Sequence, residues 1–331
     1  MTSPRASIII TTHERPDKLR RAVESAFAAG REAEVIVVDD ASSDKTADVC
    51  SSIDGIKYVR VERNQGVAGA RNVGLIASRG QFITFLDDDD LRLPHSLDAQ
   101  IEALGKCPEA MLCYAPAVPQ DAGGQEHPPF PDVLAQGDIF WQLLRHNFIP
   151  CGSVVFRRDC LAPVGLLDDS LTRIDDWDLW LRITERFPAI ALETPVLVWR
   201  QPSLRSMQGS SDTLEVIDLS IRHFHRSCFR LRRLADASRQ QRQHAWRVFS
   251  TNLADHLAWE TFRGLCTGQL RRSFTSATAL LRLHPGALVQ LLSKWTRPAT
   301  IKTLLSNSLV GGNLDQAKIH FKEIRSIPDN R

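Results

Sequence analysis

The sequence predicts an α/β protein with a mostly parallel β-sheet flanked by helices, followed by an all-helical C-terminal region. Two observations indicate this fold. Over residues 5–105, short β-branched runs alternate with helix-length segments, as in sheets wound with crossover helices. Beyond residue 212 no strand-like run remains. We therefore expect a first domain over residues 1–211, with halves 5–105 and 106–211, and a basic helical region over 212–331.

The first half should alternate strictly between strands and helices. Apolar, β-branched runs predict strands over residues 6–11, 34–38, 58–61 and 81–86. Pro16, Ser43 or Asp44, and Val67 open segments that predict helices ending near residues 29, 50 and 78. Polar residues gather after each strand, and ligands of such sheets bind outside the carboxyl ends of the strands. Residues far apart in the chain should therefore share one crevice: Thr11, Arg15, Asp39, Asp40 and Asp87–Asp90.

The second half is less regular. Strands are expected over residues 111–114, 151–158 and 190–198, and helices over residues 139–146 and 175–183. The stretch from Pro116 to Pro131 is rich in Pro, Gly, Gln and Asp, which predicts a loop.

Four consecutive aspartates, Asp87–Asp90, end the strand over residues 81–86. Adjacent carboxylates at the end of a buried strand repel one another and lose solvation. A divalent cation reverses this cost, because Mg²⁺ and Mn²⁺ prefer hard oxygen ligands. A solvated acidic turn ahead of the helix near Pro94 is the alternative reading of the same run.

A second acidic pair, Asp175 and Asp176, opens the helix expected over residues 175–183. Acids in a first turn are stabilised by the helix dipole and by free amide groups, which accounts for one of the two without a function. Trp177 follows the pair, either as a core residue or as a surface on which a ligand can stack.

Composition excludes several classes of protein. The 331 residues contain 43% hydrophobic and 24% charged residues, which is typical of a globular protein, and the net charge of +2 gives no argument for nucleic acid. The seven cysteines have no metal-ligand spacing, no apolar run reaches the ~20 residues of a membrane span, and the first strand leaves no room for a signal peptide. We expect a cytoplasmic protein.

Residues 221–247 are strongly basic. A helix of this composition can lie on an anionic membrane surface, meet an acidic partner, or simply present a solvated face while its apolar stripe packs. The arginines of this segment are Arg222, Arg226, Arg230, Arg232, Arg233, Arg239, Arg242 and Arg247.

Several stretches together resemble the family 2 glycosyltransferases, the inverting enzymes with the GT-A fold. They follow one another in the order and spacing of that family over roughly residues 5 to 205. The stretches are residues 7–16, 35–42, 64–74, 85–94, 149–156, 164–165 and 175–182. The tail beyond about residue 212 is not covered by the resemblance.

The resemblance implies a role for each matching residue. Residues 5–105 would bind the nucleotide-sugar donor and residues 106–211 the acceptor. Asp89, with Asp87, would hold Mn²⁺ or Mg²⁺, and Asp87 or Asp88 would face the ribose. Asp176 would be the catalytic base, with Asp175 beside it, and Trp177 would stack on the acceptor sugar. The remaining donor-binding residues would be Thr11, Arg15, Asp39, Asp40 and Arg71.

Two departures from the family pattern stand out. Asp175 replaces the glutamate of a Glu-Asp pair, and Trp199-Arg200 is not followed by a histidine. If that histidine completes the metal shell elsewhere, water must do so here, or Arg200 or Arg205 neutralises the diphosphate directly.

The resemblance predicts an inverting, metal-dependent enzyme that moves one sugar from a nucleoside-diphosphate sugar, UDP above all, to a hydroxyl of a glycan or lipid-linked acceptor. Cell-surface polysaccharide or lipopolysaccharide synthesis is the expected pathway, and the basic tail would give a peripheral contact with the inner membrane. The alternatives are a nucleotidyltransferase, against which the glycine-free loop at residues 12–16 counts, and an inactive binding module.

Overall fold

The structure is a computed structural model that describes residues 3–121, 123–200, 213–266, 268 and 270–283. It divides into two compact units, Met1–Ala245 and Trp246–Arg331, which are taken separately below. The expected boundary between residues 211 and 212 lies outside the described residues.

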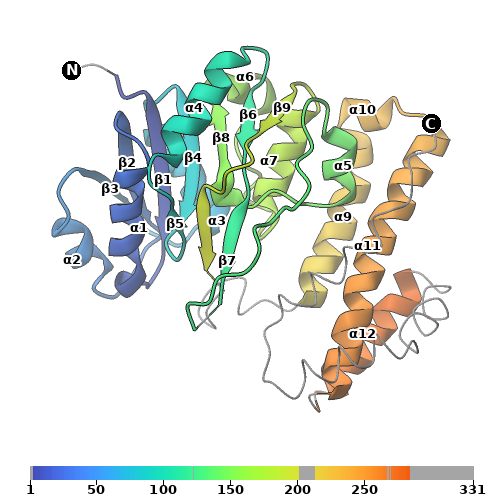
Figure 1. The fold of residues 1–331 in the computed structure, drawn as a ribbon. Helices are drawn as coiled ribbons and strands as arrows, with labels where there is room; N and C mark the ends of the chain where they lie inside the picture. Colours follow the sequence, from blue (N-terminus) through green and yellow to red (C-terminus); the bar gives the residue numbers. More distant parts are fainter. Residues whose placement is uncertain (1–2, 122, 201–212, 267, 269, 284–331) are drawn as a thin grey trace. The chain divides into compact units, whose positions relative to one another are not determined.

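A seven-stranded sheet forms the centre of the first unit (Figure 1). Its order is β3-β2-β1-β4-β8-β6-β9, and every neighbouring pair is parallel except those that β8 makes with β4 and β6. The predicted α/β fold with a mostly parallel sheet is therefore confirmed. The strands are β1 (Ala6–Thr12), β2 (Ala33–Asp39), β3 (Ile56–Arg60), β4 (Phe82–Asp87), β6 (Leu112–Tyr114), β8 (Val154–Arg157) and β9 (Ala189–Ala191).

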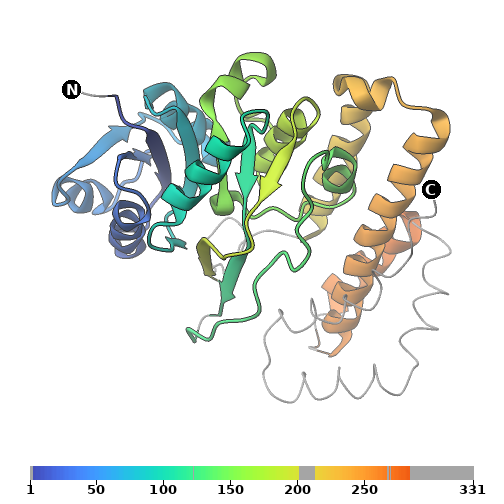
Figure 2. The same cartoon turned by 45° about the horizontal axis from the view of Figure 1, so that its top comes forward.

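Helices cover both faces of this sheet, as the views in Figures 1 and 2 show. Ile8 and Ile10 of β1 share a core with α1 (Pro16–Ala29) and α4 (Ser96–Lys106). Ile9 points to the opposite face because side chains alternate along a strand. There it meets α3 (Gly66–Ala77) at Gly74, where an added Cβ would lie 2.3 Å from the Ile9 Cγ2 atom.

The helix α7 (Asp175–Thr184) lies on the same face as α3. Its Trp180 is fully buried against Phe85 of β4 and Phe156 of β8, with ring centroids 6.4 and 5.7 Å away. This aromatic contact places the N-terminus of α7 near the carboxyl end of β4. Shorter helices complete the layers: α2 (Thr46–Ser51), α5 (Phe140–Arg145) and α6 (Leu161–Val164).

A small second sheet corrects two expectations. Its order is β5 (Leu91–Arg92), β10 (Leu197–Arg200) and β7 (Ala117–Gln120). The expected loop over residues 116–131 thus begins with a strand, and the expected single strand over residues 190–198 is two strands in different sheets. Pro195 separates them, because proline cannot donate to a ladder.

The described residues beyond 212 are helical, as predicted. Helices α9 (Thr213–Arg230) and α10 (Arg232–Ala235) belong to the first unit, while α11 (Arg239–Cys266) continues into the second, which also holds α12 (Leu270–Leu283). The basic segment is not one helix, since it is interrupted at Leu231 and again after α10. Among the described helices we find none with the length and apolarity of a membrane span.

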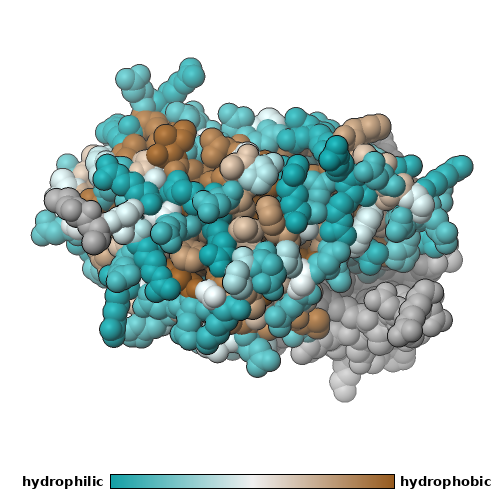
Figure 3. Space-filling view, turned by 90° about the horizontal axis from the view of Figure 1, so that it is seen from above, coloured by the Kyte–Doolittle hydropathy of each residue, from teal (hydrophilic) through white to brown (hydrophobic). Residues whose placement is uncertain are grey.

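Hydrophilic side chains cover most of the face shown in Figure 3, with hydrophobic side chains visible between them. Large apolar side chains that are strongly exposed are scattered among the described residues. In the first unit the two most exposed are Ile76 on α3, at 75%, and Phe229 on α9, at 89%.

Candidate active site

The carboxyl ends of β1, β2 and β4 meet at one edge of the large sheet. Thr12 pairs with Asp39 in the β1–β2 register, and Thr11 pairs with Asp87 in the β1–β4 register. The Asp40 N–H donates to the Thr12 carbonyl oxygen at 2.9 Å. The predicted gathering of these polar residues at one edge is therefore confirmed.

The four aspartates at the end of β4 alternate in exposure. The side chains of Asp87 and Asp89 are 31% and 11% exposed, whereas that of Asp88 is 4% exposed. Asp88 accepts hydrogen bonds from the Thr12 hydroxyl at 2.7 Å and from Arg15 Nη1 at 2.9 Å. Asp90 is also buried and accepts from the Arg200 N–H at 2.9 Å. Asp87 and Asp89 thus have the more exposed side chains of this run.

Basic side chains surround these two carboxylates. Asp89 Oδ2 lies 3.2 Å from Arg15 Nη1 and 3.7 Å from Lys18 Nζ. Arg71 is buried and spans two clusters: its Nη2 is 2.7 Å from Asp87 and its Nη1 is 2.8 Å from Asp175 at the start of α7. Arg71 therefore joins the acids of β4 to those of α7.

Burial and mutual repulsion make the run at the end of β4 electrostatically unfavourable. Burial raises the pKa of Asp88 to about 6 against the opposing charge of Arg15. Burial also raises the pKa values of Asp89 and Asp90, and the charge of Asp87 adds to both increases. Cations bound at this edge would relieve the repulsion.

Asp175 and Asp176 differ in what they can do. Asp175 is 2% exposed and paired with Arg71, while Asp176 is partly exposed and its Oδ1 accepts from the Trp177 N–H at 2.7 Å. Its surroundings raise the pKa of Asp176 to about 7 through burial and through the charge of Asp175, with Arg71 opposing. A carboxyl with this pKa can accept a proton near neutral pH.

A turn between the two acidic clusters is held by a buried arginine. Arg92 is 2% exposed and donates from Nη1 to the Gly152 carbonyl oxygen at 2.9 Å and to the Thr84 hydroxyl at 2.8 Å. Gly152 belongs to the 3₁₀ turn η1 (Cys151–Ser153). The charges of Arg71, Asp176, Asp87 and Asp175 all act on the Cys151 thiol, whose pKa burial raises. The turn therefore belongs to the wall of the site.

Three predicted site residues are less accessible than expected. Asp39 is fully buried, with Oδ2 accepting from the Tyr58 hydroxyl at 2.6 Å and Oδ1 from the Ser42 N–H at 2.8 Å, so the structure does not present it to a ligand. Asp40 is 4% exposed and accepts from the Gln65 N–H at 2.7 Å.

Trp177 is the third, and it corrects the expectation of stacking on an acceptor. It is 3% exposed, and its indole N–H donates to the Leu143 carbonyl oxygen at 2.8 Å. Trp177, on α7, packs in the core against α5. Burial suits its large apolar ring, and the Leu143 carbonyl provides the one acceptor that its N–H needs.

The sequence analysis did not name two residues of the site, Thr12 and Lys18, and did not indicate the partners of Arg200. Thr12 directly follows Thr11, and Lys18 lies about one helical turn beyond Arg15. Their spacing from these named residues could have indicated them. The contacts of Arg200 with Asp90 and with the Asp89 carbonyl oxygen join residues 110 and 111 positions apart, which no local pattern reveals. Arg205, the other predicted diphosphate partner, lies outside the described residues.

A cation at this edge would be held by few protein ligands. Within the part of the chain that the structure describes, no group of at least three His, Cys, Asp or Glu side chains is arranged to hold a metal. The available donors are the Asp87 and Asp89 carboxylates. Two hard oxygen donors suit Mg²⁺ or Mn²⁺ when water and a bound diphosphate complete the shell.

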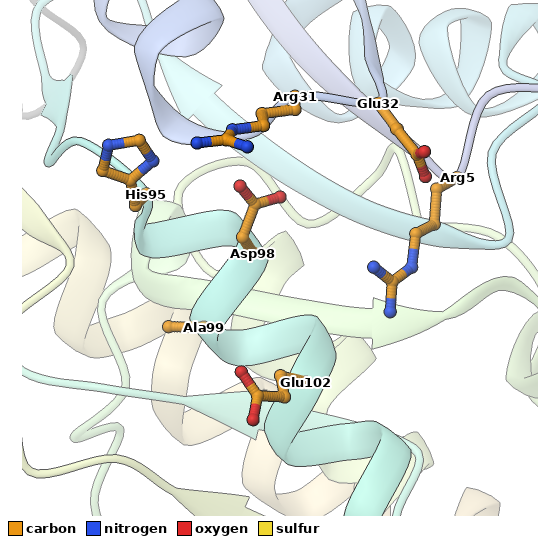
Figure 4. A pocket seen from close by; sticks show the side chains of 7 residues that line it. All are labelled: Arg5, Arg31, Glu32, His95, Asp98, Ala99 and Glu102. Carbon is orange, nitrogen blue, oxygen red and sulfur yellow. The ribbon is translucent and has the colours of Figure 1, made fainter.

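A hollow of the described surface lies elsewhere. It measures about 490 Å³ and is lined by both basic and acidic side chains, which Figure 4 shows. Arg5 precedes β1, so this hollow lies at the amino ends of the strands, opposite the acidic edge. Parallel sheets bind ligands at the carboxyl ends, and we therefore assign no function to it. Its lining residues are Arg5, Arg31, Glu32, His95, Asp98, Ala99 and Glu102.

The fold and the site together define an α/β enzyme whose ligands bind at the carboxyl edge of a parallel sheet. Residues 7–164 match the family described as "Glycosyl transferase family 2". This match covers 158 of the 331 residues and confirms the resemblance to the family 2 glycosyltransferases.

Curated relatives are named as glycosyltransferases or as polysaccharide biosynthesis proteins. An uncharacterized glycosyltransferase of Haemophilus influenzae is 25% identical over 227 residues, covering 66% of this chain and 76% of the relative. The Escherichia coli protein WfaP, "UDP-Glc:alpha-D-GlcNAc-diphosphoundecaprenol beta-1,3-glucosyltransferase", is 29% identical over 189 residues, covering 54% and 70%. The succinoglycan biosynthesis protein ExoU of Rhizobium meliloti is 31% identical over 189 residues, covering 53% and 55%.

Solved structures share the fold. The structure of S. aureus TarS residues 1–349 in complex with UDP-GlcNAc has a TM-score of 0.60 at 16% identity, covering 94% of this chain and 93% of that one. At this identity the likeness concerns the fold, and it agrees with the GT-A architecture that the sequence predicts.

Proposed function

We propose that the protein is an inverting glycosyltransferase that moves one sugar from a nucleoside-diphosphate sugar to a hydroxyl of its acceptor. The observation that carries the proposal is the pair of carboxylate clusters that Arg71 joins. One cluster, Asp87 and Asp89, suits a cation on the leaving diphosphate, and the other, Asp175 and Asp176, suits activation of the acceptor.

The donor is a UDP-sugar in this proposal. WfaP is named for a UDP-Glc donor, and TarS was solved with UDP-GlcNAc, which supports UDP as the nucleotide. Thr11 and Arg15 would line the nucleotide, and Asp40 would accept a hydrogen bond from the N–H of the uracil ring, as an acceptor-only carboxylate can. The Arg15, Lys18 and Arg71 side chains bring positive charge to the diphosphate.

Mn²⁺ or Mg²⁺ would be held by Asp89 and Asp87, the two more exposed members of the run. When bound, such a cation neutralises charge that develops on the departing diphosphate. Asp88 would support this site rather than bind the metal, because its carboxylate is directed toward Thr12 and Arg15.

Transfer would proceed in one displacement. The acceptor hydroxyl oxygen attacks the anomeric carbon as the bond from that carbon to the diphosphate oxygen breaks. The hydroxyl proton passes to the Asp176 carboxylate, and the electron pair of the broken bond leaves with UDP. Arg71, which holds Asp175, would keep the second carboxylate from competing for that proton.

The acceptor class follows from the relatives. WfaP is named for a diphosphoundecaprenol-linked acceptor and ExoU for succinoglycan biosynthesis, which supports a glycan or lipid-linked acceptor in cell-surface polysaccharide synthesis. A peripheral membrane contact would suit a lipid-linked acceptor. Phe229, exposed at 89% between the exposed Arg226, Arg230 and Arg232, is the feature that supports it.

Titration calorimetry with UDP, dTDP, GDP and CMP, each with and without Mn²⁺, tests the donor and the metal together. We expect UDP to bind best, only with Mn²⁺, and to lose affinity in Asp89→Asn. Binding of UDP without the metal would assign the diphosphate to arginines instead. Failure of every nucleotide to bind would favour the inactive binding module.

A further inference from the structure

The helix α9 packs against the helix that carries the proposed base (Figures 1 and 2). Its His223 is 2% exposed and lies with its ring 5.2 Å from the ring of Trp177 on α7. Arg173, just ahead of α7, pairs with Glu215 of α9 at 2.8 Å. Both helices belong to the same compact unit.

Asp178 is the point at which α9 meets the first turn of α7. It is 4% exposed, and its Oδ2 accepts from Arg182 Nε at 2.8 Å within α7. Its Oδ1 lies 3.8 Å from both Arg230 Nη1 and His223 Nδ1 of α9. Arg182 supplies the hydrogen bond that this buried carboxylate needs, and the positive charge of Arg230 adds to it at longer range.

The arginines of α9 and α10 also bind acids elsewhere in this unit. Asp168, ahead of α7, lies 3.1 Å from Arg230 Nη1 and 3.4 Å from Arg226 Nη1. Arg233 of α10 is 2.6 Å from Asp138. Three of the eight arginines of this segment, Arg226, Arg230 and Arg233, are therefore matched to carboxylates of the α/β part of the chain.

Asp176 lies directly before two residues that are held from outside α7. Trp177 is fixed by its hydrogen bond to Leu143 of α5 and lies against the His223 ring, and Asp178 lies within 3.8 Å of the Arg230 guanidinium. We propose that α9 positions the catalytic base. Arg230 acts on Asp178 and so fixes the rotation of the first turn of α7 about the helix axis and its position along that axis. The Asp176 carboxylate is thereby held in place. This inference rests on Asp176 being the base.

The inference gives a function to residues beyond the family match, which ends at residue 164. Arg230 is a positioning residue, since it acts through Asp178 and is not placed on the substrate. Loss of its contact should affect the proton-transfer step more than donor binding, because the donor side of the crevice is built on β1, β2 and β4.

The test compares Arg230→Met and Arg230→Lys with a matched control on the same helix, Arg222→Met. Arg222 pairs with Asp218 of its own helix at 3.0 Å, and both side chains are 66% exposed. The readouts are UDP release from UDP-glucose at saturating donor with water as acceptor, the pH dependence of that rate, and UDP affinity with Mn²⁺.

We expect Arg230→Met to lower the rate at saturating donor roughly tenfold, since small displacements of a catalytic group are costly. The pH dependence should shift, UDP affinity should stay within about twofold, and Arg230→Lys should recover most of the rate. The control should match the wild type. A rate for Arg230→Met equal to that of the control would overturn the inference, as would a parallel loss of rate and UDP affinity.

Asp178→Asn separates a local role from general damage, because it keeps the volume of the side chain and removes the negative charge that Arg182 and Arg230 share. If Arg230 acts through Asp178, combining both substitutions adds no further loss; multiplying losses would place the effect at Asp168 instead and overturn the inference. Asp176→Asn is measured alongside. Normal turnover in that variant would contradict the assigned base, whereas its loss together with an unaffected Arg230→Met would contradict the positioning role alone.

Discussion

Asp176 combines a functional advantage with a cost to stability. Its surroundings raise its pKa to about 7, chiefly by burial, whereas an aspartate in an unfolded chain titrates near about 3.9. The folded state therefore holds a proton that the unfolded state has already released. The corresponding stability is fully present below the unfolded pKa and is lost as the pH rises from there through about 7.

The rate should follow the ionised form of Asp176. At saturating donor, we expect turnover to rise with pH up to a plateau, with an apparent pKa of about 7. Steady-state rates from about pH 5 to about pH 9 measure it, with UDP affinity followed over the same range as the control. A rate that is constant below pH 7 would be incompatible with this carboxyl as the base.

Asp176→Asn should abolish transfer and stabilise the protein at alkaline pH. We expect the free energy of unfolding to rise by roughly 2 kcal/mol at about pH 8 and to change little at about pH 4, because only the ionised aspartate disfavours the folded state. Chemical denaturation of the metal-free protein at both pH values measures this difference. A stabilisation of equal size at both pH values would assign the effect to packing.

Residue-level predictability was uneven for a physical reason. The identity of the acidic residues indicated the site, but four identical side chains gave no register. The register proposed above rests on the partners of Asp88 and Asp90. Asp39 and Trp177 looked like ligand contacts because their type and position suited that role. Their burial depends on Tyr58 and Leu143, which lie in other elements.

At the level of elements, close approach of helix and sheet decides where glycine is needed. Gly74 lets α3 lie directly on Ile9, and an added Cβ would come within 2.3 Å of that side chain. Gly105 in α4 has no heavy atom within 4 Å of an added Cβ. Alanine substitutions at Gly74 and Gly105 therefore distinguish the effect of overpacking from that of helix propensity.

Gly74→Ala should destabilise the fold by roughly 1–3 kcal/mol through overpacking, while Gly105→Ala should be neutral or stabilising by up to about 1 kcal/mol. Denaturant unfolding of both variants beside the wild type measures the two effects. Equal stabilisation in both would show that α3 can move away from the sheet at little cost.

Regular elements were more predictable than the small sheet. The buried run in β1 and the proline at the start of α1 indicate these elements within a few residues. The strand β7 pairs with β10, which follows it by some eighty positions, and its own sequence contains Pro119, so local patterns favoured a loop. The pairing of strands far apart in the chain is the part of this fold that local sequence patterns do not predict.

For the whole molecule, the exposed part of the basic segment bears on where the enzyme works. We expect the protein to float with vesicles that contain phosphatidylglycerol and not with phosphatidylcholine vesicles, because arginine attracts anionic lipid and an exposed phenylalanine can enter the interface. Phe229→Ser should reduce the bound fraction, and Ile76→Ser, which removes another exposed apolar side chain, should not. Equal loss in both variants would argue against Phe229 as the contact.

The pairing of α9 and α10 with acids of the α/β part also limits how the chain can be shortened or grafted. A chain ending after β10 would retain every strand of both sheets. It would, however, leave Asp138 without Arg233 and Asp168 without Arg226 and Arg230, and would remove the Arg230 charge near Asp178. The side of α7 that carries Trp177 would meet water. Hybrids between relatives should therefore be joined after α10, so that the catalytic helix and the helix against which it packs come from the same parent.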